Sequence, residues 1–198
     1  GTGASNMLLY GDAGTGKSST VKAVAASMAP DGLRVIEVRK NQLYQIPDIM
    51  EELSVNPLRF IIFIDDLSFN GNDDNFSALK ATLEGSISGC SDNIAIYATS
   101  NRRHLVKETF SDRTGDELHV NDTLQETMSL AARFGLTITF QKPDKDEYLH
   151  IVKELATEYG IDMDEAELFR KAEAHAIRKN GRSPRTAKQF IELLKIGI

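Results

Sequence analysis

Residues 11–18 read Gly-Asp-Ala-Gly-Thr-Gly-Lys-Ser, which fits the pattern G-x-x-x-x-G-K-[ST] of a phosphate-binding loop. Gly14 and Gly16 allow backbone conformations that aim successive N–H groups at an anion. The Lys17 ammonium can reach the β- and γ-phosphates, and the Ser18 hydroxyl can bind magnesium. An apolar run precedes the loop and a helical pattern follows it, as this kind of site requires. The residues expected to contact ATP or ADP are Gly11, Asp12, Ala13, Gly14, Thr15, Gly16, Lys17, Ser18 and Ser19.

Outward from this loop, short apolar runs alternate with longer helical patterns, which indicates a parallel sheet with crossover helices. The expected strands are residues 7–10, 34–38, 60–64, 94–99 and 136–140. The expected helices between them are residues 17–29, 47–53, 75–87 and 123–133. After Pro143 three amphipathic helical patterns follow, over residues 145–159, 164–179 and 184–196. We therefore predict an α/β nucleotide-binding domain over residues 1–141 and a small all-helical domain over residues 142–198.

The composition is that of an ordinary globular protein, with 41% hydrophobic and 26% charged residues. The formal net charge of −6 gives no general attraction to nucleic acid. The candidates for a local basic patch are Arg102, Arg103, Lys107 and residues 178–188. No apolar run approaches the ~20 residues that cross a bilayer. The single cysteine, Cys90, fits a reducing compartment, so we expect a cytoplasmic protein without membrane contact.

Two carboxylates, Asp65 and Asp66, directly follow the run 60–64, which is apolar at every position. Such a run is typical of a strand that is buried on both faces. In open α/β sheets ligands bind at the carboxyl ends of the strands, so both carboxylates should face the phosphate-binding loop. Asp65 suits the magnesium shell, together with Ser18, and Asp66 suits activation of the attacking water. The alternative for Asp66 is a solvated loop carboxylate or a helix cap.

Taken together, these motifs resemble the AAA+ superfamily of ATPases. The resemblance implies a five-stranded parallel sheet in the order 5-1-4-3-2, sandwiched by helices, and a C-terminal helical lid. It implies that Asp65 is the Walker-B residue and that Asp66 replaces the commoner glutamate, as in bacterial initiators and helicase loaders of the superfamily. Ala98-Thr99-Ser100-Asn101 looks like the sensor-1 strand, which implies that Asn101 lies beside the γ-phosphate and the water. The alternative for Asn101 is a turn residue.

Two arginines extend the resemblance. Ala132-Arg133-Phe134-Gly135 is similar to the arginine-finger segment, which implies that Arg133 acts on a neighbouring subunit of a homo-oligomer. The alternative for Arg133 is a cation that complements the dipole in the last turn of a helix. Gly181-Arg182-Ser183-Pro184-Arg185 looks like the sensor-2 motif, with Ser183 as the N-cap of the last helix. A cation at a helix N-terminus needs an anion nearby, which favours a γ-phosphate contact by Arg185, with Arg182 as the competitor.

More narrowly, four strings resemble a bacterial family of single-AAA+ proteins that is known only as a domain of unknown function with predicted ATP binding. These strings are residues 9–19, 65–69, 97–105 and 132–135. Within them we interpret Arg102 and Arg103 as surface charges and His104 as structural. Few residues precede Met7, so we expect the adenine-contacting segment of AAA+ proteins to lie outside this chain.

The leading functional hypothesis is a magnesium-dependent AAA+ ATPase that remodels or loads an unknown macromolecular partner. A second hypothesis is a nucleotide-dependent switch or binding module with little hydrolysis, which the Asp65-Asp66 pair and the acidic composition permit. A third hypothesis is a P-loop kinase for a small molecule. The long segment after the fourth strand, Arg133 and the helical C-terminus all weaken the kinase hypothesis. Steady ATP turnover without an acceptor separates the first hypothesis from the other two.

Overall fold

The computed structural model describes residues 5–67, 74–89, 92–101, 131–179 and 181–197. The chain forms two compact units. The sheet unit comprises Gly1–Gly11 and Lys17–Thr139. The helical unit comprises Asp12–Gly16 and Phe140–Ile198, so the apex of the phosphate-binding loop is grouped with the C-terminal helices.

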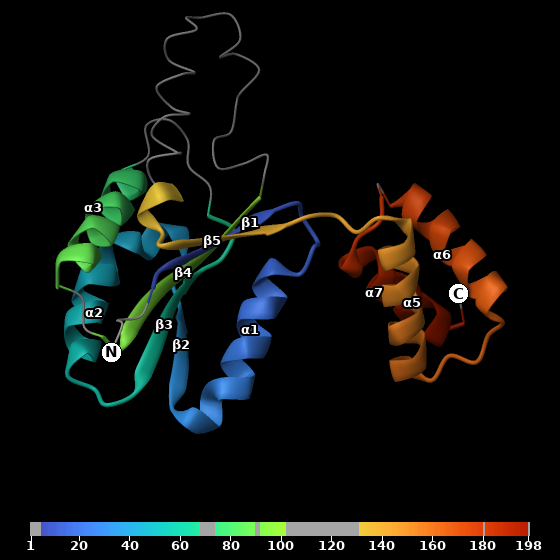
Figure 1. Ribbon diagram of the computed structural model, residues 1–198, viewed down its shortest axis with the longest axis horizontal. Helices are drawn as coiled ribbons and strands as arrows, with labels where there is room; N and C mark the ends of the chain where they lie inside the picture. Colours follow the sequence, from blue (N-terminus) through green and yellow to red (C-terminus); the bar gives the residue numbers. More distant parts are fainter. Residues whose placement is uncertain (1–4, 68–73, 90–91, 102–130, 180, 198) are drawn as a thin grey trace, which may run out of the picture. The chain divides into compact units, whose positions relative to one another are not determined.

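The sheet unit is built on five parallel strands. They are β1 (Met7–Gly11), β2 (Leu33–Glu37), β3 (Arg59–Ile64), β4 (Ile94–Asn101) and β5 (Leu136–Phe140). Their order is β2-β3-β4-β1-β5, which is the predicted order read from the opposite edge and confirms it (Figure 1). β4 pairs with β1 on one side, where Gly11 lies opposite Asn101, and with β3 on the other, where Ile64 lies opposite Ala98. The carboxyl ends of β1, β3 and β4 therefore lie side by side.

Helices cover both faces of this sheet. They are α1 (Lys17–Met28), α2 (Ile46–Ser54) and α3 (Asp74–Gly89), with 3-10 turns η1 (Ala29–Asp31) and η2 (Lys40–Gln45). Figure 1 shows α2 and α3 on one side of the sheet and α1 on the other. Because side chains alternate along a strand, Leu8, Ile62 and Ile64 share one face, where they pack with Ile46 and Leu79 of the helices. The predicted sandwich of helices around a buried β3 is confirmed.

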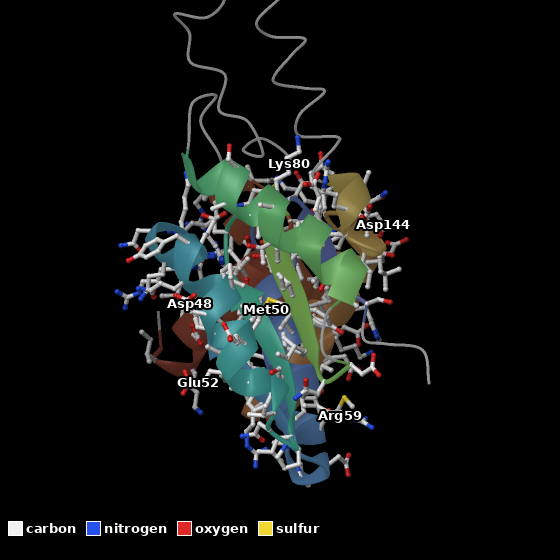
Figure 2. All side chains as sticks on the ribbon, turned by 90° about the vertical axis from the view of Figure 1, so that its left-hand side faces the viewer. Asp48, Met50, Glu52, Arg59, Lys80 and Asp144 are labelled. Atoms are coloured by element: carbon white, nitrogen blue, oxygen red, sulfur yellow. The ribbon has the colours of Figure 1, made fainter. Side chains whose placement is uncertain are left out.

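Figure 2 shows the outer side of α2 and α3. Asp48 and Glu52 are exposed one turn apart on α2, while Met50 is partly buried and packs against the core. Residues 131–133 are helical, but the rest of the predicted helix over 123–133 lies outside the described residues. The other predictions outside the described residues concern Cys90, Arg102, Arg103, His104 and Lys107. Within the part of the chain that is described, no helix has both the length and the apolar character needed to cross a membrane.

The helical unit contains α5 (Lys145–Tyr159), α6 (Glu165–Arg178) and α7 (Pro184–Lys195), which confirms the three predicted helices. Each begins at a side-chain cap, because Asp144, Asp164 and Ser183 accept hydrogen bonds from backbone N–H groups in the first turn. α5 ends at Gly160, whose φ of 67° is a conformation that favours glycine. The apolar faces of the three helices enclose a core of Tyr148, Val152, Ala156, Leu168, Ala172, Ala176, Ala187, Phe190 and Ile191.

The Asn93 side chain, just before β4, is hydrogen-bonded to the segment between α2 and β3. Its Nδ2 lies 3.1 Å from the Leu53 carbonyl oxygen, 2.9 Å from that of Asn56 and 3.1 Å from that of Leu58. The two protons of this amide are therefore shared among three carbonyl oxygens, at the end of α2, in the following turn and in the segment that leads into β3. The Asn56 side chain is an acceptor and not a donor, because its Oδ1 accepts a hydrogen bond from the Leu58 N–H at 3.0 Å.

We expect Asn93→Asp to lower the free energy of unfolding by about 3 kcal/mol, because a carboxylate would face carbonyl oxygens and would have no proton to donate. Asn56→Asp is the matched control, since it keeps the oxygen that accepts from Leu58, and it should change the same free energy by less than about 0.5 kcal/mol. Chemical denaturation of the wild type and the two variants measures both values. Equal effects of the two substitutions would contradict the role assigned to Asn93.

Candidate functional site

The phosphate-binding loop leaves β1 at Gly11 and enters α1 at Lys17. The Lys17 residue is only 6% exposed, and its Nζ donates hydrogen bonds to the Gly11 carbonyl at 3.0 Å and to Asn101 Oδ1 at 2.9 Å. The pairing of β1 with β4 explains the second contact, because Gly11 lies opposite Asn101 in the sheet. A buried ammonium is therefore held between the carboxyl ends of two adjacent strands.

Asp65, the first residue after β3, lies among hydrogen-bond donors. Its Oδ1 accepts hydrogen bonds from Ser18 Oγ at 2.6 Å and from Thr99 Oγ1 at 2.6 Å. A hydroxyl and a carboxylate are hard oxygen ligands, and magnesium is usually held by one or two such protein groups together with phosphates and water. The chemistry and the closeness of Ser18 and Asp65 therefore fit the magnesium site that the sequence predicts.

Asp66 has an unusual backbone conformation, with a left-handed φ of 54° that few residues other than glycine adopt. Its N–H donates to Thr99 Oγ1 at 2.9 Å, and its Oδ1 accepts a hydrogen bond from Asn101 Nδ2 at 2.7 Å. The Asn101 amide therefore links Lys17 to Asp66, because its oxygen accepts from the ammonium and its nitrogen donates to the carboxylate. We call the hydrogen-bonded group of Lys17, Ser18, Asp65, Asp66 and Asn101 the strand-end cluster.

The apex of the loop, Asp12–Gly16, belongs to the helical unit and contacts the start of α7. The Gly14 carbonyl accepts a hydrogen bond from the Arg185 N–H at 3.2 Å. Gly14 has a φ of 79°, and a Cβ at this position would lie 3.2 Å from both Ser183 Oγ and Arg185 Cβ. Glycine is therefore required at position 14 both by the backbone conformation and by the close approach of α7.

The other loop residues of the predicted site have simpler surroundings. Thr15 is buried and donates from its hydroxyl to the Asp12 carbonyl at 2.8 Å. The Asp12 N–H donates to the Phe140 carbonyl at 3.3 Å, which ties the loop to the end of β5. Ala13 and Ser19 are exposed.

The two arginines of the predicted sensor-2 segment differ in their partners. Arg182 makes a two-point ion pair with Glu173 of α6, from Nε to Oε1 at 2.9 Å and from Nη2 to Oε2 at 2.6 Å. The hydrogen bond from Arg182 lowers the pKa of Glu173, while burial, reinforced by the charge of Glu173, raises the pKa of Tyr148 to about 12. The Arg185 side chain is exposed, and within the described part of the chain no residue binds its guanidinium. Of the two, Arg185 is therefore the one that is available to a ligand.

Arg133 pairs with Glu84 of α3. Its Nε donates to Glu84 Oε1 at 2.9 Å, and its Nη2 contacts the same oxygen. Strand β5 begins shortly after Arg133 and beside Asn6, because the Leu136 N–H donates to the Asn6 carbonyl at 3.1 Å. Asn6 precedes β1 and the phosphate-binding loop follows it, so the chain around Arg133 joins the sheet at the opposite end of β1 from Lys17. The strand-end cluster does not include Arg133.

Three residues at these sites were not revealed by sequence patterns. Thr99, which bonds the Asp65 carboxylate and the Asp66 N–H, had a weak signal, because strand alternation sets it on the same face as Asn101. Glu84 and Glu173 had no signal. Their arginine partners are 49 and 9 residues away, and such pairs form only through tertiary packing.

This sheet order, with the loop between β1 and α1 and the polar ends of β3 and β4, is that of the AAA+ ATPase-domain fold, and similar solved structures confirm the fold. The ORC2 protein of Aeropyrum pernix has a TM-score of 0.64 and 16% identity, over 98% of this chain and 57% of that chain. The RuvB Holliday junction branch migration motor of Thermotoga maritima has a TM-score of 0.61 and 16% identity, over 97% of this chain and 54% of that chain. The FIGL-1 AAA domain in complex with ADP has a TM-score of 0.58 and 17% identity, over 98% of this chain and 61% of that chain. The chain therefore spans little more than half the length of these structures.

The chain belongs to the family described as "Protein of unknown function (DUF815)", whose model matches residues 1–197. This result agrees with the predicted resemblance to a single-AAA+ family of unknown function. No match to the sequence was found among curated proteins.

The ion pair between Glu173 and Arg182 makes the stability of the helical unit depend on pH. Because the pKa of Glu173 is lowered in the folded protein, the pair stabilises the fold above the ordinary value of 4.5, and this stabilisation is lost as the pH falls through the lowered pKa. We expect the Tm of the wild type to exceed that of Glu173→Gln near neutral pH, and the difference to disappear in acid. Thermal melts over a pH series measure the difference. Glu154→Gln, at an exposed position on α5, should follow the wild type, and a pH-independent difference for Glu173→Gln would rule out this account.

Proposed function

We propose that this chain is the ATP-binding core of a magnesium-dependent ATPase that couples hydrolysis to the remodelling or loading of a macromolecular partner. The observation that carries the proposal is the strand-end cluster, in which an ammonium, a hydroxyl, two carboxylates and an amide are joined by hydrogen bonds. Phosphoryl transfer to water needs these groups, because its catalysis rests on positioning and on stabilisation of charge. Two of the similar structures were solved with ADP or with ADPNP and ADP, which favours an adenine nucleotide.

Each member of the cluster has a role in this proposal. Lys17 exchanges its contacts with Gly11 and Asn101 for oxygens of the β- and γ-phosphates. Ser18 and Asp65 would hold Mg²⁺, which would neutralise part of the phosphate charge. Asp66 accepts a proton from the attacking water, and Asn101 orients that water beside the γ-phosphate.

In the same proposal residues 1–141 act as the ATPase core and residues 142–198 as a lid. Support comes from the hydrogen bond between the Gly14 carbonyl and the Arg185 N–H, which ties the start of α7 to the apex of the loop. The exposed Arg185 guanidinium then contacts the γ-phosphate and loses this contact after hydrolysis. Arg182 has no such role, because Glu173 binds it at two points.

A second candidate is a nucleotide-dependent switch with little hydrolysis. The observation in its favour is that Asp66 Oδ1 accepts a hydrogen bond from Asn101 Nδ2 at 2.7 Å, so one oxygen of the expected base is engaged by the protein itself. Both candidates need nucleotide binding, but only the ATPase needs steady turnover.

Nucleotide binding tests the proposed function directly. Lys17→Ala removes a charge-assisted contact to the phosphates and leaves the loop backbone in place, so we expect the affinity for ATP to fall at least ~10-fold. Titration of a fluorescent ATP analogue in the presence of Mg²⁺ measures the affinity. Lys22→Ala is the control, since this α1 lysine has a side chain that is 61% exposed and lies 3.9 Å from Glu37. Equal affinity of Lys17→Ala and the wild type would overturn the proposed function.

The two carboxylates should separate hydrolysis from metal binding. Asp66→Asn keeps the shape of the side chain but removes the proton acceptor, so ATP should bind normally while turnover falls about 100-fold. Asp65→Asn should instead weaken the magnesium dependence of ATP binding by about 10-fold. A phosphate-release assay and a magnesium titration measure these effects. If turnover is unchanged in Asp66→Asn, another residue activates the attacking water. If the wild type binds ATP but shows no turnover, the result favours the nucleotide-dependent switch.

We also propose that Arg133 acts in trans, on the γ-phosphate of a neighbouring copy of this chain. Arg133 lies at the opposite end of β1 from Lys17. This place supports the proposal, because it suits a guanidinium that acts on the site of another copy and not on the site of its own chain. The pair with Glu84 is accessible, with side-chain exposures of 22% for Arg133 and 51% for Glu84, so a neighbour can approach it. The alternative is a structural ion pair between α3 and the segment before β5.

Complementation distinguishes the trans role of Arg133 from the structural one. We expect Arg133→Ala and Lys17→Ala subunits each to lose turnover, since a finger in trans contributes about 10³- to 10⁵-fold in GTPases. A mixture of the two should regain part of it, because one subunit keeps the loop and the other keeps the finger. The specific activity of the wild type should rise with its concentration. A mixture that stays inactive where the wild type is active and assembled would leave Arg133 with a structural role only.

A further inference from the structure

Thr99 bonds both aspartates of the strand-end cluster, Asp65 through its carboxylate and Asp66 through its backbone N–H. It is 1% exposed, and its Oγ1 donates to Asp65 Oδ1 at 2.6 Å while it accepts from the Asp66 N–H at 2.9 Å. A hydroxyl has one proton, and an ionised carboxylate can only accept, so the direction of both hydrogen bonds is determined. One side chain of β4 therefore fixes the carboxylate of one aspartate and the backbone of the next.

The same stretch of β4 also holds the chain that follows β3. The Thr99 carbonyl accepts from the Leu67 N–H at 2.7 Å, and Ser100 Oγ donates to the Leu67 carbonyl at 2.7 Å. Asp66 lies between Asp65 and Leu67, with its left-handed φ of 54°. The bond from its N–H to Thr99 Oγ1 holds this conformation, in which the Asp66 carboxylate also meets Asn101.

We propose that Thr99 is a positioning residue of the ATPase site, and that its hydroxyl holds Asp65 for the metal and Asp66 for the attacking water. This inference rests on the proposed function and adds a residue to it. Thr99 acts through the Asp65 carboxylate and the Asp66 backbone, and it needs no contact of its own with nucleotide or metal. Because its β-branched side chain is stiff and its strand is paired on both sides, the hydroxyl has little freedom to move. Its removal should therefore disturb both carboxylates together.

Three substitutions at position 99 test the role of the hydroxyl. Thr99→Ser keeps the hydroxyl, Thr99→Val keeps the shape without it, and Thr99→Ala loses both. Thr82→Val is the matched control, because it removes a buried hydroxyl that donates within α3 to the Ala78 carbonyl at 2.9 Å. For each variant we would measure hydrogen exchange of the Asp66 amide, ATP affinity with Mg²⁺ and in EDTA, and steady-state turnover.

We expect Thr99→Val and Thr99→Ala to speed the exchange of the Asp66 amide and to lower kcat by about 10- to 100-fold. The gain in ATP affinity on addition of Mg²⁺ should shrink by about 10-fold, while the affinity in EDTA stays at the wild-type value. Thr99→Ser and Thr82→Val should match the wild type in every measurement. A merely structural role would lower stability without separating metal-dependent from metal-free binding.

Wild-type kcat and magnesium dependence in Thr99→Val, or an equal loss of both in Thr99→Ser, would overturn the proposal. If Thr99→Val does not fold, the comparison of Thr99→Ala with Thr99→Ser decides in the same way. If the proposed function itself is wrong, the result is different, because the wild type then does not bind ATP in the presence of Mg²⁺. Failure of this inference alone leaves binding and turnover of the wild type intact.

Discussion

Strand β4 is hydrogen-bonded between β1 and β3, and the whole strand-end cluster depends on this pairing. The register sets Gly11 opposite Asn101, and this is why Lys17 and Asn101, 84 positions apart in the chain, meet at 2.9 Å. The pairing of β4 with β3 brings Thr99 to Asp65 in the same way, over 34 positions. A shift in the register of β4 by one residue would turn Thr99 and Asn101 to the other face of the sheet, and their hydrogen bonds in the cluster would be lost.

The two adjacent carboxylates repel each other, and the fold offsets this repulsion with neutral donors. Asp65 Oδ1 accepts from the hydroxyls of Ser18 and Thr99, and Asp66 Oδ1 accepts from the amide of Asn101. Hydroxyl and amide groups hold the carboxylates in position without removing their charge. On the proposed function this charge is what a magnesium ion and an attacking water need, and preorganised groups of this kind need little rearrangement during reaction.

The phosphate-binding loop belongs to both units of the chain. Its ends, Gly11 and Lys17, are grouped with the sheet, and its apex, Asp12–Gly16, is grouped with the C-terminal helices. Within the helical unit Gly14 contacts the start of α7, since its carbonyl accepts from the Arg185 N–H and a Cβ at this position would lie 3.2 Å from Arg185 Cβ.

The sequence by itself determined the order and approximate bounds of the described α-helices and strands, because apolar periodicity, capping residues and turn residues act over a few neighbours, but it did not reveal the 3-10 turns η1 and η2. It also indicated that Asp65 and Asp66 would lie near the loop, since ligands bind at the carboxyl ends of parallel strands, and the resemblance to the sensor-1 strand implied the same for Asn101. Only the tertiary structure decided that Thr99 bonds the Asp65 carboxylate and the Asp66 N–H, and that Asp66 adopts a left-handed backbone conformation. It likewise decided that Glu173 binds Arg182, while Arg185 stays exposed. These features depend on side-chain direction and on contacts between distant segments, which packing determines and local pattern does not.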